Sequence, residues 1–344
     1  MRTERIKWID TAKGIGIIAV ILGHLYVHKF SIALYAFHLP LFFFLGGYTL
    51  KTDRPFGTFL KKRVLSLLVP YIFAAAIICV FFFVRDCVMG NSQAIRYLLY
   101  NIKTVIIQKR KWSLWFLSVL FFLCVIYYPL HKRGPKTLTV ATAILFALGL
   151  CYNKWIRTAL PLNLDIVFVA SPYFATGVLA KEYALVDKYI LKTSGKKAGV
   201  LFAVNLVVAA AATWISYAVT GERLDLCYSE LGVVPLTYIA ALTAIAAIIY
   251  LCSCIEKHSR AISSIGANSF VYFAFHQQIF ITLINDCVVK YGLFTSVITS
   301  KHIQVAISFV LTFVIVLITA GIIKLLEKSK HSFLLTGRKR YLPK

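Results

Sequence analysis

Long apolar runs recur along this chain, and short polar segments that contain Lys and Arg separate them. A helix needs about 20 mostly apolar residues to cross the hydrocarbon core of a bilayer, and most of the runs are about that long. The pattern therefore predicts an all-α integral membrane protein with about ten transmembrane helices. We expect these helices approximately at residues 9–28, 33–50, 64–84, 113–130, 137–152, 164–180, 198–219, 233–255, 264–285 and 303–325.

The composition agrees with a membrane protein. Hydrophobic residues make up 60% of the 344 residues, and the mean hydropathy is +0.78, far above that of a soluble domain. No repeat, low-complexity region or linker divides the chain. The first apolar run has no small-residue cleavage site and more runs follow it, so it is not a removable signal. We expect a single transmembrane domain over residues 1–344 that ends in a short basic cytoplasmic tail at 326–344.

The distribution of positive charge predicts the orientation. An even number of spans puts both termini on one side, and with that side cytoplasmic about two thirds of the 38 Lys and Arg residues lie inside. The net charge of +25 could also suit a nucleic-acid-binding protein. No nucleic-acid-binding motif is present, so attraction to anionic membrane surfaces accounts for the charge.

One basic segment opposes this orientation, because it would lie outside the cell between the third and fourth spans. An amphipathic helix on an anionic outer leaflet, or a site for an acidic glycan, would explain it, as would an ordinary solvated loop. Its six cationic residues are Arg85, Arg96, Lys103, Lys109, Arg110 and Lys111.

The first span carries ionisable residues that lipid should exclude. At roughly 100° per residue, Lys13 and His24 lie within about 20° of one another around the helix and about 16 Å apart along it. Asp10 lies about 40° to the other side of His24. An ionisable residue within a span is costly and marks a functional site by default. The spacing therefore predicts one polar stripe from the inner rim into the bilayer.

Other polar side chains would lie near this stripe. His38 opens the second span and should reach a depth similar to that of His24, while Asn268 and His276 form a polar stripe in the ninth span. Such residues also serve as hydrogen-bonding contacts between helices. Trp115 begins the fourth span at the outer face, where aromatic belts place Trp regardless of function, although it could also stack on a sugar.

A basic cluster follows the second span at the inner rim. Lys61, Lys62 and Arg63 lie in this short loop, where they could contact the phosphates of a cytoplasmic ligand or simply anchor the topology. The cysteines show no metal-ligand spacing, so we expect no metal.

Several of these blocks resemble the membrane acyltransferase-3 family, and within it the sugar O-acetyltransferases of the fucose-acetylase type. The first span matches the family's basic residue and His separated by ten residues, as Lys13 and His24. The second span matches its Phe-His-x-Pro-Leu-Phe-Phe-Phe-x-x-Gly-Tyr pattern. Weaker matches follow along nearly the whole chain. The matching blocks are at 13–24, 37–48, 59–71, 114–117, 171–181 and 265–276.

The resemblance implies an acyl-CoA-dependent O-acetyltransferase of a cell envelope. Acetyl-CoA would be the donor substrate, and the acceptor would be a cell-surface polysaccharide or a lipid-linked sugar precursor. His24 would be catalytic, because a neutral imidazole can take the proton from an attacking hydroxyl. Asp10, His38, Trp115, Asn268 and His276 would support catalysis or contact the acceptor, and Lys13, Lys61, Lys62 and Arg63 would bind the donor.

The chain departs from the family at the donor site, and a rival function remains. The family has an Arg-x-x-Arg-like element where this chain has Arg63 followed by Ser66, so Lys61 or Lys62 would replace the second cation. A transporter or exporter of glycan precursors would share the spans and the buried polar groups. It would be expected to show paired halves with broken helices. We find no internal symmetry of that kind, and we expect a multi-pass protein of a bacterial plasma membrane.

Overall fold

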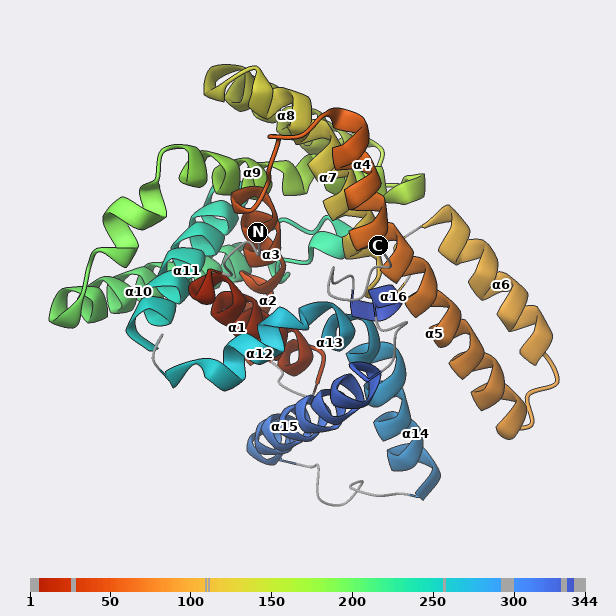
Figure 1. Cartoon of the computed structure of the whole chain (residues 1–344). Coiled ribbons are helices and arrows are strands. Elements are labelled where there is room, and N and C mark those ends of the chain that lie inside the picture. Colours follow the sequence, from red (N-terminus) through yellow and green to blue (C-terminus); the bar gives the residue numbers. More distant parts are fainter. Residues whose placement is uncertain are drawn as a thin grey trace.

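The computed structural model describes residues 6–25, 29–108, 110, 112–255, 258–291, 300–328 and 333–336. These residues form a bundle of helices without a β-sheet (Figure 1). The longer helices are α1 (Lys7–Gly23), α5 (Val69–Val88), α7 (Trp115–Lys132), α8 (Pro135–Trp155), α9 (Leu164–Glu182), α10 (Gly195–Thr220), α11 (Val234–Ile255) and α15 (Lys301–Leu326). The shorter helices are α2 (Phe30–Tyr35), α3 (His38–Tyr48), α4 (Phe56–Arg63), α6 (Ala94–Ile107), α12 (Arg260–Ala267), α13 (Ser269–Phe275), α14 (Thr282–Tyr291) and α16 (Phe333–Thr336).

The predicted spans coincide with helical segments. Within the described residues, eight helical segments are long and apolar enough to cross a membrane by length and composition, and three of them join consecutive elements, such as α2 and α3. The other two predicted spans correspond to α1, which has 17 residues, and to the interrupted segment from α12 to α14. The chain is therefore an all-α multi-pass membrane protein.

The ninth predicted span is not one continuous helix. It breaks at Asn268, and residues His276–Ile281 form a π-helical turn, η6, before α14. The Asn268 side chain donates a hydrogen bond to the Ser264 carbonyl at 3.2 Å. Side chains of this type offer the backbone an alternative to regular helix, which explains the break. Polar positions in this segment thus interrupt the helix that the apolar pattern predicts.

The bundle has two ends, which we name after Lys13 of α1 and after His24, which directly follows the last residue of α1. At the Lys13 end, the Thr52 hydroxyl lies 2.9 Å from Nδ1 of His131. At the His24 end, Arg85 of α5 pairs with Asp286 of α14 at 2.6 Å, and the Asn153 amide donates to the Ser229 carbonyl. These contacts tie helices together at each end of the bundle.

Glycines allow two helix pairs to pack closely. A Cβ added at Gly47 of α3 would lie 2.0 Å from the Phe174 carbonyl oxygen of α9, and one at Gly266 of α12 would lie 1.7 Å from the Asp10 carbonyl oxygen of α1. Small residues permit such backbone approach inside membranes. The contacts fix α3 and α12, two helices that border the interior spaces described below.

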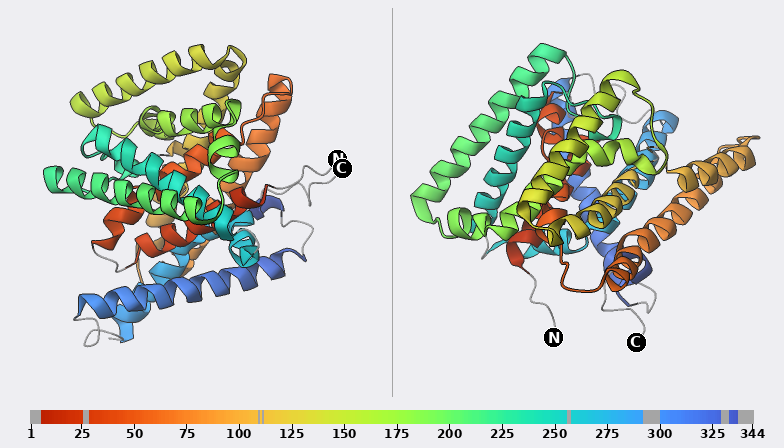
Figure 2. Two further views of the ribbon diagram at one scale, coloured as in Figure 1. Left: turned by 90° about the vertical axis from the view of Figure 1, so that its left-hand side faces the viewer. Right: turned by 90° about the horizontal axis from the view of Figure 1, so that it is seen from above.

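The basic segment between the third and fourth spans is largely a helix. α5 and α6 form a hairpin that projects from the rest of the bundle (Figure 2). The Tyr71 hydroxyl of α5 donates to the Val105 carbonyl of α6 at 2.8 Å. Ile95, Leu99 and Ile106 of α6 are exposed, so residues 94–107 do not form a solvated loop. Lys109 and Lys111 lie outside the described residues.

Candidate functional site

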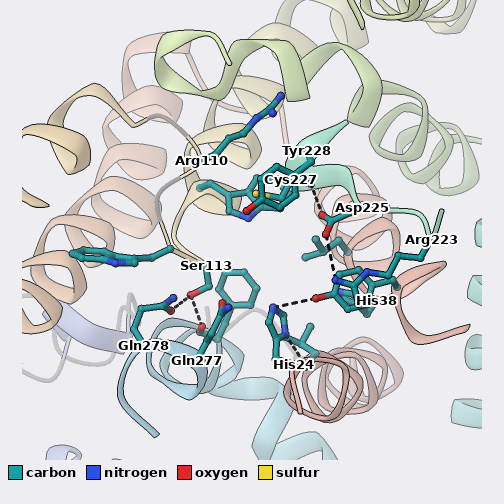
Figure 3. A pocket seen from close by; sticks show the side chains of 16 residues that line it. His24, His38, Arg110, Ser113, Arg223, Asp225, Cys227, Tyr228, Gln277 and Gln278 are labelled. Carbon is teal, nitrogen blue, oxygen red and sulfur yellow. Dashed lines mark hydrogen bonds and ion pairs between the residues drawn. The ribbon is translucent and has the colours of Figure 1, made fainter. Parts of the chain in front are cut away.

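Two cavities lie one above the other along the same helices. The His24 cavity has a volume of about 440 Å³, and the Lys13 cavity has a volume of about 260 Å³. The His24 cavity is lined mainly by aromatic and polar side chains, among them Tyr35, His38, Arg110, Trp112, Ser113, Trp115, Arg223, Asp225, Tyr228, Gln277 and Gln278 (Figure 3). The Lys13 cavity is lined by Ile17, Phe42, Thr49, Arg63, Ser66, Phe116, Leu120, Cys124, Asn268, Ser269, Phe270 and Phe273, together with Lys13.

Helix α1 borders both cavities with one face. Lys13 and Ile17 line the Lys13 cavity, and Val20 and His24 line the His24 cavity. These positions follow one another at helical spacings of three or four residues, so they share a face. The structure therefore places Lys13 and His24 on one stripe, in two separate spaces.

The hydrogen bonds of His24 fix its tautomer. Its Nδ1 lies 2.8 Å from the Val20 carbonyl oxygen, which can only accept, so Nδ1 carries the proton and Nε2 carries an acceptor lone pair. The Tyr35 hydroxyl lies 3.4 Å from that Nε2. The imidazole points into the His24 cavity (Figure 3). A base with this orientation can accept a proton from a hydroxyl bound in the cavity.

Two further imidazoles surround His24 and have the same tautomer. His38 is 1% exposed and donates from Nδ1 to the Leu34 carbonyl at 2.7 Å. His276 is 0% exposed, donates from Nδ1 to the Phe273 carbonyl at 2.9 Å, and lies with its ring centroid 5.0 Å from that of His24. Nε2 of His276 has no hydrogen-bond partner among the described residues. His38 lines the His24 cavity, whereas His276 packs edge to face against the His24 ring and does not line the cavity.

The loop between α10 and α11 reaches the His24 cavity through Arg223. The Arg223 guanidinium stacks over the Tyr35 ring at 3.8 Å from its centroid and pairs with Asp225 at 3.8 Å. Burial raises the pKa of the Asp225 carboxyl to about 6, against the opposing effect of Arg223. This loop therefore holds Tyr35 beside His24. Protonation of the Asp225 carboxylate would weaken the ion pair that positions Arg223 over the Tyr35 ring.

The opposite wall of the cavity comes from the segment before α7. Arg110 forms an ion pair with Asp165 and lies over the Tyr228 ring at 5.9 Å from its centroid. The Ser113 hydroxyl lies 3.0 Å from Oε1 of Gln278 and 3.0 Å from the Phe273 carbonyl oxygen, so these two acceptors share its one proton. Trp115, the first residue of α7, is buried against this wall rather than in an exposed belt. Aromatic faces and amide groups at one wall suit a polar ring such as a sugar.

The Lys13 cavity contains polar atoms that lack partners. Nε of Arg63 and Oδ1 of Asn268 are buried without a hydrogen bond to any described residue. Buried polar atoms are normally satisfied, so each of these calls for a ligand or water. Ser66 lines the cavity as well.

The remaining predicted residues lie outside the two cavities. Lys61 and Lys62 are exposed on α4, next to Arg63, and Asp10 lies on α1 where α12 packs. Sequence reasoning missed Tyr35, Arg223 and Asp225, because nothing in a local pattern joins a loop after α10 to α2. The only sign of these residues in the sequence is that a cationic and an acidic residue, Arg223 and Asp225, closely follow an apolar run. Among the described residues no group of three metal-ligating side chains is suitably arranged.

Comparison with known proteins gives one finding. The sequence model of the acyltransferase domain family, the membrane acyltransferase-3 family, matches residues 6–321, which include both cavities. No curated protein and no solved structure matches the chain.

Proposed function

Because this chain belongs to the membrane acyltransferase-3 family, we propose that it transfers acetyl from cytoplasmic acetyl-CoA to a hydroxyl of a cell-envelope glycan or of its lipid-linked precursor. The protein is a membrane acyltransferase; the donor, the acceptor and a bacterial plasma membrane are parts of the proposal. The observation that carries it is the face of α1 that links Lys13 to His24 across two cavities.

The Lys13 cavity suits the acyl end of the donor. Its unpartnered Arg63 Nε can donate to a donor carbonyl, and the unpartnered Asn268 Oδ1 can accept from an amide of the pantetheine arm. Lys61 and Lys62 on the exposed side of α4 would pair with the phosphates of CoA. This arrangement requires the Lys13 end to face the cytoplasm, as the charge distribution predicts.

The His24 cavity suits the acceptor. Its volume of about 440 Å³ is within the range of small-molecule sites, and it combines aromatic rings with amide and guanidinium groups. A sugar bound there presents hydroxyl groups to Nε2 of His24.

The reaction then follows from the His24 tautomer. The acceptor oxygen attacks the thioester carbonyl carbon while its proton passes to Nε2 of His24. The C–O bond forms, the C–S bond breaks, and the proton leaves His24 for the thiolate of CoA. The Val20 carbonyl stabilises the transient imidazolium through Nδ1–H.

Turnover of acetyl-CoA by purified protein tests this proposal. We expect release of CoA thiol together with acetylation of an added glycan. A transporter would move the glycan without producing any thiol, and that result would exclude the acyltransfer reaction.

Sealed vesicles of known orientation test the proposed sidedness. Acetyl-CoA is supplied at the Lys13 end only, and an impermeant glycan is placed on one side or the other. We expect acetylation only of glycan at the His24 end. Acetylation confined to glycan on the same side as the donor would contradict transfer across the membrane.

A further inference from the structure

A cluster of aromatic rings separates the two cavities. Among the described residues, Phe273 of α13 is the one that lines both of them. Its ring centroid lies 5.3 Å from that of Phe116, which lies 4.7 Å from Phe43 of α3. All three side chains are at most 7% exposed. The space between the Lys13 cavity and the His24 cavity is therefore filled with apolar rings.

This separation lies across the route that the proposed reaction needs. Ile17 marks the near wall of the Lys13 cavity, and His24 is seven residues further along α1. Seven residues correspond to about 10 Å of helix. A thioester held in the Lys13 cavity must therefore pass the rings of Phe116 and Phe273 to reach Nε2 of His24.

We infer that Phe116 and Phe273 form a partition that admits the acyl end of the donor and excludes water from it, so that the glycan rather than water receives the acyl group. This inference rests on the proposed function. Water that reached the thioester would attack the same carbonyl carbon, form acetate, and release CoA thiol without any acceptor. An apolar partition raises the cost of bringing water there.

The two rings come from helical segments of different length. Phe116 is in the first turn of the continuous helix α7 and packs against Phe42, Phe43 and Trp115. Phe273 is on α13, a helix of seven residues between the break at Asn268 and the π-helical turn η6.

Hydrogen bonds hold the backbone of Phe273, so the opening that we infer is assigned to its side chain. The Phe273 carbonyl accepts a hydrogen bond from Nδ1 of His276 at 2.9 Å and shares the Ser113 hydroxyl proton, at 3.0 Å, with Oε1 of Gln278. Rotation of the ring into one of the adjoining cavities opens the partition without moving α13. The movement needs no new space, because a cavity lies on each side of the ring.

Thiol labelling tests the partition without any acyl transfer. Ser66→Cys places a thiol in the Lys13 cavity, and a small membrane-impermeant methanethiosulfonate ammonium reagent is added only at the His24 end of oriented proteoliposomes. The modified peptide is quantified by mass spectrometry, so the native cysteines do not interfere. We expect Phe273→Ala to speed this labelling at least tenfold, and Phe313→Ala, an exposed position on α15, to leave it unchanged.

Phe273→Leu keeps more apolar volume than Phe273→Ala and serves as the folded variant if the Ala variant does not fold. We expect Phe273→Leu to give a labelling rate between those of the unaltered protein and Phe273→Ala. Labelling from the Lys13 end provides the positive control. Equal labelling from the His24 end in all variants would overturn the partition.

A kinetic measurement links the partition to specificity. In Phe273→Ala, we expect the ratio of CoA thiol released to glycan acetylated to rise several-fold above that of the unaltered protein. An unchanged ratio in an active variant would contradict the role in excluding water. If the unaltered protein turned over no acetyl-CoA, the proposed function would fail, while the labelling result would still decide whether the partition exists.

Discussion

At the scale of single residues, the tautomer of His24 is the feature with the most direct chemical consequence. Its Nδ1–H is held by the Val20 carbonyl at 2.8 Å, so Nε2 is the atom available as a base. His38 and His276 are anchored in the same way by backbone carbonyls of the preceding helices, Leu34 of α2 and Phe273 of α13.

Replacing His24 removes the proposed base. We expect His24→Ala and His24→Asn to lower the rate of acyl transfer by at least about a hundredfold, the usual contribution of a general base. The melting temperature in detergent should change little, because His24 is only partly buried at the end of α1. His131→Ala, at the Lys13 end, is the matched control and should retain activity. Near-normal turnover by His24→Ala would rule out this mechanism.

Asp225 predicts a pH dependence of acceptor binding. Burial raises its pKa to about 6, so above that pH the carboxylate is charged and holds Arg223 over Tyr35. Below it the carboxyl is neutral and the ion pair is lost. We expect KM for the glycan to increase as the pH falls through 6 in the unaltered protein. Asp225→Asn should have the high KM throughout, and a parallel pH profile in both proteins would contradict this role.

The same shift affects stability with a defined sign. Because the pKa of folded Asp225 lies above its ordinary value of 3.8, the folded protein binds more protons than the unfolded chain between about pH 4 and 6. The contribution of Asp225 to stability therefore decreases as the pH rises through this window. The melting temperature of Asp225→Asn, measured between about pH 4 and 6, should lack the decrease with rising pH that Asp225 contributes.

At the scale of helices, close backbone packing positions the site. A Cβ at Gly177 of α9 would lie 2.0 Å from the Phe44 carbonyl oxygen of α3, which cannot move aside as a flexible side chain can. We expect Gly177→Ala to destabilise the protein by about 1–3 kcal/mol, the usual cost of overpacking. Gly199→Ala, where nothing lies within 4 Å, should be neutral or slightly stabilising. Thermal unfolding measures both, and equal melting temperatures would show that α3 and α9 can separate freely.

At the scale of the whole molecule, donor binding should distinguish the cavity from the exposed rim. Lys13 and Arg63 line the Lys13 cavity, whereas Lys61 and Lys62 are exposed on α4. Lys13→Gln with Arg63→Gln should raise the Kd for acetyl-CoA about tenfold or more at all salt concentrations. The effect of Lys61→Gln with Lys62→Gln should fade in high salt, because exposed charges are screened. Isothermal titration calorimetry at two ionic strengths would measure the Kd of each double variant. If the Kd of both variants depended on salt in the same way, neither pair would have a specific role in donor binding.

The class of fold and the stripe on α1 follow from the amino-acid sequence alone. Apolar runs of bilayer length predict the helices because a spanning backbone must satisfy its hydrogen bonds internally. Lys13 and His24 share a face because both are on one continuous helix, where sequence spacing fixes direction. The same reasoning failed at residues 264–285, where Asn268 and a π-helical turn interrupt the helix.

The surroundings of that stripe depend on contacts between segments that are distant in sequence. Tyr35, Arg223 and Asp225 meet at His24 although nearly two hundred residues separate Tyr35 from Arg223. The division of the interior by Phe116 and Phe273 likewise depends on side chains from α7 and α13 that touch across the bundle. Helical periodicity specifies which face of each helix is apolar, but many Phe side chains share that property. Which rings meet depends on how closely the backbones approach, and that is set by glycine contacts between helices distant in sequence.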